Sequence, residues 1–235
     1  SFPPENDVNR VIAYASQQGR KSFAALVPDT AYGKVVEAAF QQAVAGRGGR
    51  VVVIERFSPD SNSMAAAAKR LVPALQQADA LFVPAAADTM PALGLALQQA
   101  GYDSAKVKPL GTGVWNDANV ARVPAIQGGW FASPDTAGFN AFAGRYQTRF
   151  NSAPTRTATL AYDAVSLAAA LARTQGSQRF SESVLTNASG FAGADGVFRF
   201  RPDGQNDRGL AVLELRNGQI VTINAAPRDL GPRTQ

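Results

Sequence analysis

Short apolar runs alternate with segments of helical apolar spacing over the first 132 residues. The apolar runs cover 22–27, 50–56, 78–84, 108–110 and 126–132, and the helical patterns cover 4–19, 32–45, 61–77, 88–100 and 117–122. Strands that alternate with amphipathic helices predict a parallel sheet with helices on both faces. Pro73 lies inside the third helical pattern and predicts a kink or a division into two pieces.

The pattern changes after Pro134. Two helices in succession are predicted at 136–150 and 157–174, and a short one at 181–186. The helix at 157–174 is apolar almost all round, which predicts that it is deeply buried. The rest of the chain is rich in predicted strands, at 196–200, 209–215 and 219–223, with Asn217-Gly218 as a hairpin turn between the last two.

Composition removes several classes of chemistry. The 235 residues include no cysteine and no histidine, which excludes thiol catalysis, Cys or His metal sites and Ser-His-Asp triads. Gly111-Thr112-Gly113 lacks the third glycine of a dinucleotide fingerprint. We therefore expect no enzyme, no catalytic residue, no metal and no cofactor. The net charge of +5 is scattered along the chain, so no nucleic-acid partner is expected either.

Three loops follow predicted strands, and ligands of open parallel sheets bind beyond the carboxyl ends of strands. The candidate ligand-binding residues in these loops are Asp29, Thr30, Tyr32, Ala86, Asp88, Thr112 and Trp115. A structural interpretation stays open beside this one. Asp29 and Asp88 are also adequate helix caps, and Tyr32 could serve packing alone.

Several segments resemble one family when they are taken together in order. They are KSFAALVPDTAYGKVVEAAFQQAVAGRGGRVVVIERFSPD, ADALFVPA, KVKPLGTGVWND, IQGGWFASPD, ATLAYDAVSLAAALA and GFAGADGVFRFRPDG. This series is similar to type I periplasmic binding proteins, the Leu/Ile/Val-binding-like extracellular receptors. Within that fold it is most similar to the branch of penicillin-binding-protein activators.

The resemblance implies an α/β fold with a doubly wound parallel sheet. Residues 1–19 would be an inter-lobe segment and helix, and residues 20–132 a complete α/β lobe. Residues 133–235 would be helices of a partial other lobe, with C-terminal strands that return across the hinge. Most of the first lobe would be missing, which would leave the helix at 157–174 uncovered and open to dimerisation.

The function that the resemblance implies is that of a periplasmic solute-binding receptor. It would capture a small polar ligand, amino-acid-like or a cell-wall fragment, between two lobes and present it to an ABC-type membrane transporter. The alternative is a non-transport regulator of peptidoglycan synthesis that binds a penicillin-binding protein. The family's amino-acid receptors often have an acidic residue in the loop after the fourth strand, whereas this chain has no acid there before Asp117. Residues 1–5 do not resemble a signal peptide, so an export signal is not present in this sequence.

Overall fold

The computed structural model describes residues 2–231 and divides into two compact units. The first, called here the α/β unit, comprises Pro4–Ser133 and Val212–Asn224. The second, called here the helical unit, is built mainly from Pro134–Ala211. Each unit has its own sheet, and each is described by itself.

The α/β unit contains a seven-stranded sheet in the order β10-β9-β5-β4-β3-β1-β2. Strands β1 to β5 run parallel to one another, and β9 and β10 form an antiparallel pair on the β5 side of the sheet. Their bounds are β1 Ser22–Pro28, β2 Arg50–Phe57, β3 Ala80–Phe82, β4 Lys108–Gly111, β5 Trp130–Ser133, β9 Ala211–Arg216 and β10 Gln219–Asn224. The predicted α/β fold with a mostly parallel sheet is confirmed.

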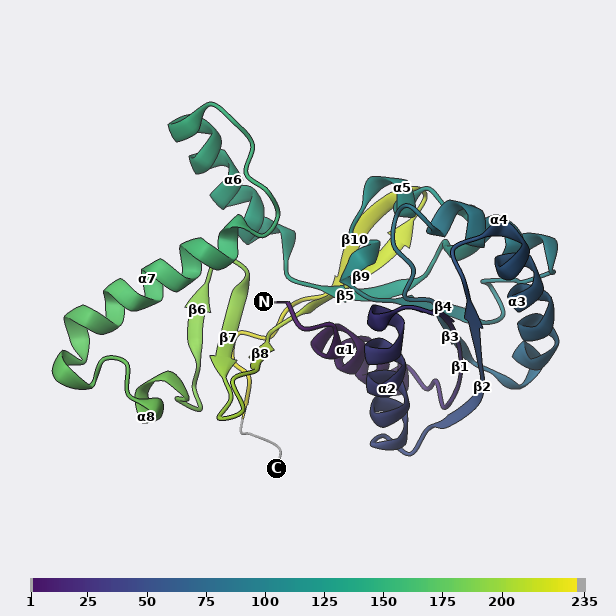
Figure 1. Ribbon diagram of the computed structural model, residues 1–235, viewed down its shortest axis with the longest axis horizontal. Helices are drawn as coiled ribbons and strands as arrows, with labels where there is room; N and C mark the ends of the chain where they lie inside the picture. Colours follow the sequence, from purple (N-terminus) through teal and green to yellow (C-terminus); the bar gives the residue numbers. More distant parts are fainter. Residues whose placement is uncertain (1, 232–235) are drawn as a thin grey trace. The chain divides into compact units, whose positions relative to one another are not determined.

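Helices cover both faces of this sheet (Figure 1). On one face α1 (Pro4–Gln17) packs against α2 (Ala31–Ala45), and on the other α3 (Ser61–Ala74) packs against α4 (Met90–Gln99). The connecting helices lie on different faces because the chain moves outward from β1 to β2 and then back to β3 and β4. Right-handed crossovers, the rule for parallel strands, place connections that run in opposite directions on opposite faces of the sheet. The short helix α5 is Ala118–Ala121.

The core of the α/β unit lies between the sheet and these helices. The rings of Phe40 and Phe82 stack with centroids 5.1 Å apart, and Phe23 meets Phe40 edge-on. β1 is fully buried from Phe23 to Val27, as expected of a central parallel strand. The central strand is therefore packed on both faces, between the two layers of helices.

The helical unit combines α6 (Thr136–Phe150), α7 (Ala158–Thr174) and α8 (Glu182–Leu185) with a three-stranded antiparallel sheet. The strands are β6 Phe191–Gly193, β7 Gly196–Phe200 and β8 Asn206–Arg208. Two buried aspartates join α7 and the segment just before it to the β6–β7 turn. Asp163 accepts a hydrogen bond from Ala194 N at 2.7 Å, and Asp195 pairs with Arg156 at 2.8 Å.

The structure corrects several expectations. The predicted strand at 126–132 begins only at Trp130, after a 3-10 turn, η3 (Pro124–Ile126). Strands β6 and β8 had not been predicted. The helix α7 is not deeply buried, since Val165 is 70% exposed. Pro73 lies inside α3 and does not itself divide the helix: α3 continues to Ala74, and a 3-10 turn, η1 (Leu75–Gln77), follows.

Candidate ligand-binding site

Three loops of the α/β unit meet at one edge of the sheet. They follow β1, β3 and β4, which lie side by side in the sheet and run parallel. Their carboxyl ends therefore lie together at the place where ligands of open parallel sheets bind. The seven candidate residues belong to these loops and to the first turns of the elements after them.

The loop after β1 is fixed by its backbone. Thr30 caps α2, because its Oγ1 accepts a hydrogen bond from Gly33 N at 3.1 Å. Gly33 is required by a close approach, since a Cβ atom there would lie 1.7 Å from the carbonyl oxygen of Pro28. Asp29 is exposed, and its backbone N–H extends the ladder to Phe57. The expected capping role of Asp29 therefore falls to Thr30.

Tyr32 joins the first loop to the third. Its hydroxyl lies 2.7 Å from Oγ1 of Thr112, which is 80 residues further along the chain. Thr112 is fully buried, whereas Tyr32 is half-buried. Burial raises the pKa of Tyr32 to about 12, so its hydroxyl stays protonated at neutral pH. The structure thus brings two predicted residues together as a neutral polar pair at the edge of the sheet.

A third polar group, which the sequence interpretation missed, joins this pair. Asp7 lies in the first turn of α1, and its Oδ2 accepts a hydrogen bond from Gly113 N at 2.8 Å. Burial raises the pKa of the Asp7 carboxyl from its usual 3.8 to about 7, against the lowering effect of that bond, and nearby Glu5 adds to the rise. In sequence Asp7 is an ordinary acid of a helix N-terminus. No pattern along the chain places it beside Gly113.

Trp115 does not face this edge of the sheet. It lies at the end of a 3-10 turn, η2 (Gly113–Trp115), and its side chain is fully buried. Its Nε1 donates to the carbonyl oxygen of Val83 at 2.9 Å, and its ring lies against the backbone of Gly111 and Gly129. The geometry gives Trp115 a packing role, because both its ring and its N–H are already engaged within the core.

The loop after β3 is small and open. Ala86 and Asp88 are exposed, and Thr89 donates from Oγ1 to Oδ1 of Asp88 at 3.1 Å. The N-cap residue of α4 is Thr89 rather than Asp88, and the Thr89 side chain makes no capping hydrogen bond. Asp88 therefore remains a surface carboxylate beside the edge that contains Tyr32.

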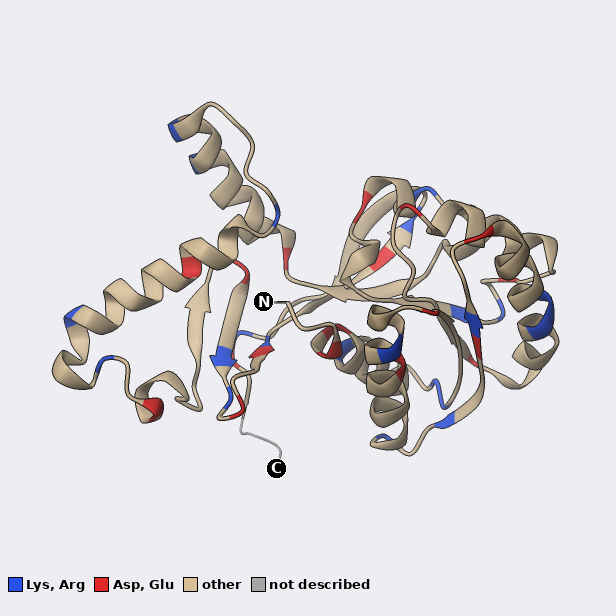
Figure 2. Cartoon of the chain, in the orientation of Figure 1, with Lys and Arg blue, Asp and Glu red and all other residues tan. Residues whose placement is uncertain are grey.

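Other features of the described residues do not compete with this edge. Among residues 2–231, no group of Asp and Glu side chains is arranged to hold a metal ion. Within the same range, no helix is both long and apolar enough to cross a membrane. Lysine, arginine, aspartate and glutamate are scattered over both units rather than gathered in one patch (Figure 2).

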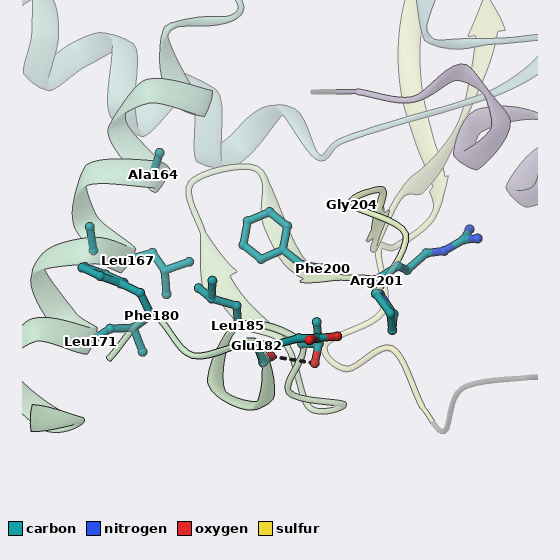
Figure 3. A pocket seen from close by; sticks show the side chains of 12 residues that line it. Ala164, Leu167, Leu171, Phe180, Glu182, Leu185, Phe200, Arg201 and Gly204 are labelled. Atoms are coloured by element: carbon teal, nitrogen blue, oxygen red, sulfur yellow. Dashed lines mark hydrogen bonds between the residues drawn. The ribbon is translucent and has the colours of Figure 1, made fainter. Parts of the chain in front are cut away.

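The helical unit contains two apolar hollows. One, of about 570 Å³, lies between α7, α8 and the end of β7 (Figure 3). The other, of about 580 Å³, lies on α6 and α7 beside Tyr162 and Val165. Both are lined mostly by apolar side chains, and sites for small polar ligands need several convergent polar groups. The sheet edge of the α/β unit is therefore the better candidate.

A family model described as "Periplasmic binding protein" matches residues 1–219. The comparison with curated proteins gives no match.

Three solved structures illustrate the fold. A candidate branched-chain amino acid ABC transporter from Rhodospirillum rubrum is 24% identical, with a TM-score of 0.80 over 95% of this chain and 66% of that one. A substrate-binding protein from Desulfitobacterium hafniense in complex with Leu is 18% identical, with a TM-score of 0.65 over 94% and 65%. A solute-binding protein from R. palustris in complex with 4-hydroxybenzoate is 20% identical, with a TM-score of 0.66 over 95% and 66%.

These likenesses establish the fold, and the chain spans slightly less than two thirds of the length of each of these proteins. The family model is more specific, because it covers more than nine tenths of the chain. The chain belongs to the periplasmic binding protein family, whose members bind solutes and are not enzymes.

Proposed function

We propose that this chain is part of a periplasmic solute-binding receptor that serves an ABC-type membrane transporter. Its ligand is a small polar molecule that binds at the carboxyl ends of β1, β3 and β4. Membership of the family supports the receptor class. The structurally similar proteins from D. hafniense and R. palustris contain leucine and 4-hydroxybenzoate, which supports a ligand of that size.

The observation that carries the proposal is the Tyr32–Thr112 pair. Its 2.7 Å contact holds a half-buried hydroxyl at the strand-end edge. A tyrosine there can offer a ring face and a polar tip to one ligand. Asp29, Thr30, Ala86 and Asp88 then form the rim of the site, while Thr112 supports Tyr32 from beneath. Trp115 supports the loop from the core and makes no ligand contact.

A thermal-shift screen of the full-length protein tests this proposal. The panel consists of amino acids, hydroxybenzoates and peptidoglycan fragments, and affinities of the hits are measured by calorimetry. Tyr32→Phe removes the hydroxyl and keeps the ring, so the affinity of a hit should fall about fivefold to tenfold. Tyr162→Phe is the matched control, because Tyr162 is 45% exposed on α7 in the helical unit. Equal losses in both variants would remove Tyr32 from the site.

The alternative function is regulation of peptidoglycan synthesis, as in penicillin-binding-protein activators. The lack of an acid in the loop at 111–116 favours this alternative, but none of the comparisons above points to that branch. Asp7 weakens the argument, because it brings a carboxylate to the same loop from α1. If no small molecule shifts the melting temperature while a penicillin-binding protein is captured in a pull-down, the regulator replaces the receptor.

A further inference from the structure

The turn between β9 and β10 contains the only asparagine of the chain that is followed by glycine, Asn217-Gly218. Arg216 pairs with Gln219 at the ends of the two strands, so the loop between them has two residues. Both loop residues have positive φ, 53° for Asn217 and 76° for Gly218, as a two-residue hairpin of type I′ requires. Asn217 is exposed, so its side-chain amide is open to water one residue before the N–H of Gly218.

A side chain from a distant segment holds this turn. In a two-residue hairpin the N–H of the second loop residue lies outside the strand ladder and needs another partner. Gln127, which is 91 positions earlier in the chain, supplies it, because its Oε1 accepts a hydrogen bond from Gly218 N at 3.2 Å. Nε2 of Gln127 donates to the carbonyl oxygens of Ala121 and Val123 at 2.8 and 2.9 Å. Both ends of the Gln127 amide are thus engaged, and they join the turn to α5 and the residues after it.

The turn is also in van der Waals contact with the end of α5. α5 lies beside β10, and a Cβ atom on Gly218 would be 3.8 Å from Cγ of Arg122, the C-cap residue of α5. Attack of Gly218 N on the Asn217 side chain requires the peptide unit between these two residues to rotate out of the turn conformation. The bond to Gln127 and the contact with Arg122 both resist that rotation.

We propose that Asn217 is a site of spontaneous deamidation and that Gln127 holds it unreacted in the folded protein. The reaction begins when solvent base removes the proton of Gly218 N and this nitrogen attacks Cγ of Asn217. An N–C bond forms, the bond from Cγ to the side-chain nitrogen breaks, and that nitrogen leaves as ammonia with a proton from solvent. One water then opens either C–N bond of the resulting five-membered succinimide and gives aspartate or isoaspartate.

Gly218 and Gln127 have opposite effects on this reaction. Glycine permits the attack, because it has no side chain to shield its nitrogen and its backbone turns freely. Gln127 opposes the attack, because its bond keeps the proton on Gly218 N and must open before the nitrogen can approach Cγ of Asn217. Loss of one such hydrogen bond changes the population of an open state by about fivefold to tenfold.

Isoaspartate would disturb the edge of the seven-stranded sheet. It adds one carbon to the main chain at position 217, so the pairing of β9 with β10 beside the turn cannot keep its register. Leu215 of β9 also exchanges hydrogen bonds with Gly128 and Gly129, at 2.7 and 3.0 Å, just before β5. The isoaspartate form should therefore unfold at a lower denaturant concentration than the unmodified protein.

Peptide mapping by mass spectrometry tests the proposal on the full-length protein incubated at pH 8. The fraction of aspartate and isoaspartate at position 217 is followed with time in native protein, in protein unfolded in guanidinium chloride and in the folded variant Gln127→Ala. Native protein should react at least about tenfold more slowly than unfolded protein, and Gln127→Ala about fivefold to tenfold faster than native wild type. Equal rates in native and unfolded protein, or a rate that Gln127→Ala leaves unchanged or lowers, would overturn the proposal.

Two control variants make the result specific. Leu81 is fully buried in β3, which pairs with β1 and β4 rather than with the hairpin, so Leu81→Val weakens the core and leaves the turn bonded. Its rate should match that of the wild type; an acceleration equal to that of Gln127→Ala would mean that global unfolding controls the reaction, which would overturn the role of Gln127. The tryptic peptide 217–228 also contains Asn224, and Asn217→Gln should abolish its gain in mass. A gain that persists would place the reaction at another residue and overturn the site.

Discussion

Asp7 should lower the stability of the protein as the pH rises, and the variant Asp7→Asn should remove that loss. The carboxyl pKa rises from 3.8 to about 7 on folding. Between these values the native state binds more protons than the unfolded state, so the free energy of unfolding falls as the pH increases. The loss is complete from about pH 8 upward, and it is small at pH 4 and absent at lower pH.

The magnitude follows from the shift. About three pKa units at 1.36 kcal/mol each set an upper limit of about 4 kcal/mol. Asp7 is only half-buried, and solvent screening reduces the expected effect to about 1–2 kcal/mol. Asparagine carries no charge and preserves the bond to Gly113 N. At pH 8 the variant should therefore exceed the wild type in stability by that amount, and at pH 4 the two should be nearly equal.

Urea denaturation at several pH values between 4 and 8 measures this difference. Both tryptophans of the chain, Trp115 and Trp130, lie in the α/β unit, so their fluorescence reports the unfolding of the unit that contains Asp7. Other carboxylates also titrate in this range, and the difference between wild type and variant isolates Asp7. The control Asp103→Asn, which changes an exposed acid, should follow the wild-type curve. Parallel curves for wild type and Asp7→Asn across the whole range would refute the reasoning.

Four further predictions concern packing, and urea midpoints measure all of them. Gly33→Ala should destabilise the protein by about 3 kcal/mol or more, because its Cβ would lie 1.7 Å from the Pro28 oxygen. Gly144→Ala should instead gain about 0.5–1 kcal/mol, since a Cβ in that helix meets nothing within 4 Å; similar effects at both glycines would contradict the assigned contact. Trp115→Ala should cost about 3–5 kcal/mol, as expected of a fully buried ring, and a loss below 1 kcal/mol would place that ring outside the core. Val165→Ser should change stability by less than about 0.5 kcal/mol, because Val165 is 70% exposed; a large loss would mean that its face of α7 is covered.

The expectations that no observation tests stay predictions. They include the lobe boundaries at residues 19–20 and 132–133, the seven ligand-binding residues as a set, and dimerisation through α7. The structure bears on the lobe boundary at residues 19–20, because α1 packs with α2 and lies in the α/β unit. It also bears on the set of ligand-binding residues, because Trp115 is enclosed while Tyr32 and Asp88 remain accessible.

Local patterns determined most of the architecture. The apolar run at 22–27, the cap before α2 and the glycines after it are each a signal within a few residues, and together they predicted β1 and α2 nearly to the residue. Alternation of such units decided the parallel sheet, since the strands can be buried on both faces only between two layers of helices. β6 and β8 escaped detection because three-residue strands hold too little periodic pattern.

The site depended on contacts that no local pattern encodes. The sequence placed Tyr32 and Thr112 at strand ends, because strand direction and loop position follow from the alternation. The pairing of Tyr32 with Thr112, the enclosure of Trp115 and the position of Asp7 beside Gly113 are set by the order β4-β3-β1 and by the packing of α1 on the sheet. The Tyr32–Thr112 contact joins residues that are 80 positions apart in the chain, and the Asp7–Gly113 contact joins residues that are 106 positions apart. Burial and pKa depend on what surrounds a side chain in space, so only the tertiary structure could distinguish the enclosed tryptophan from the partly desolvated aspartate.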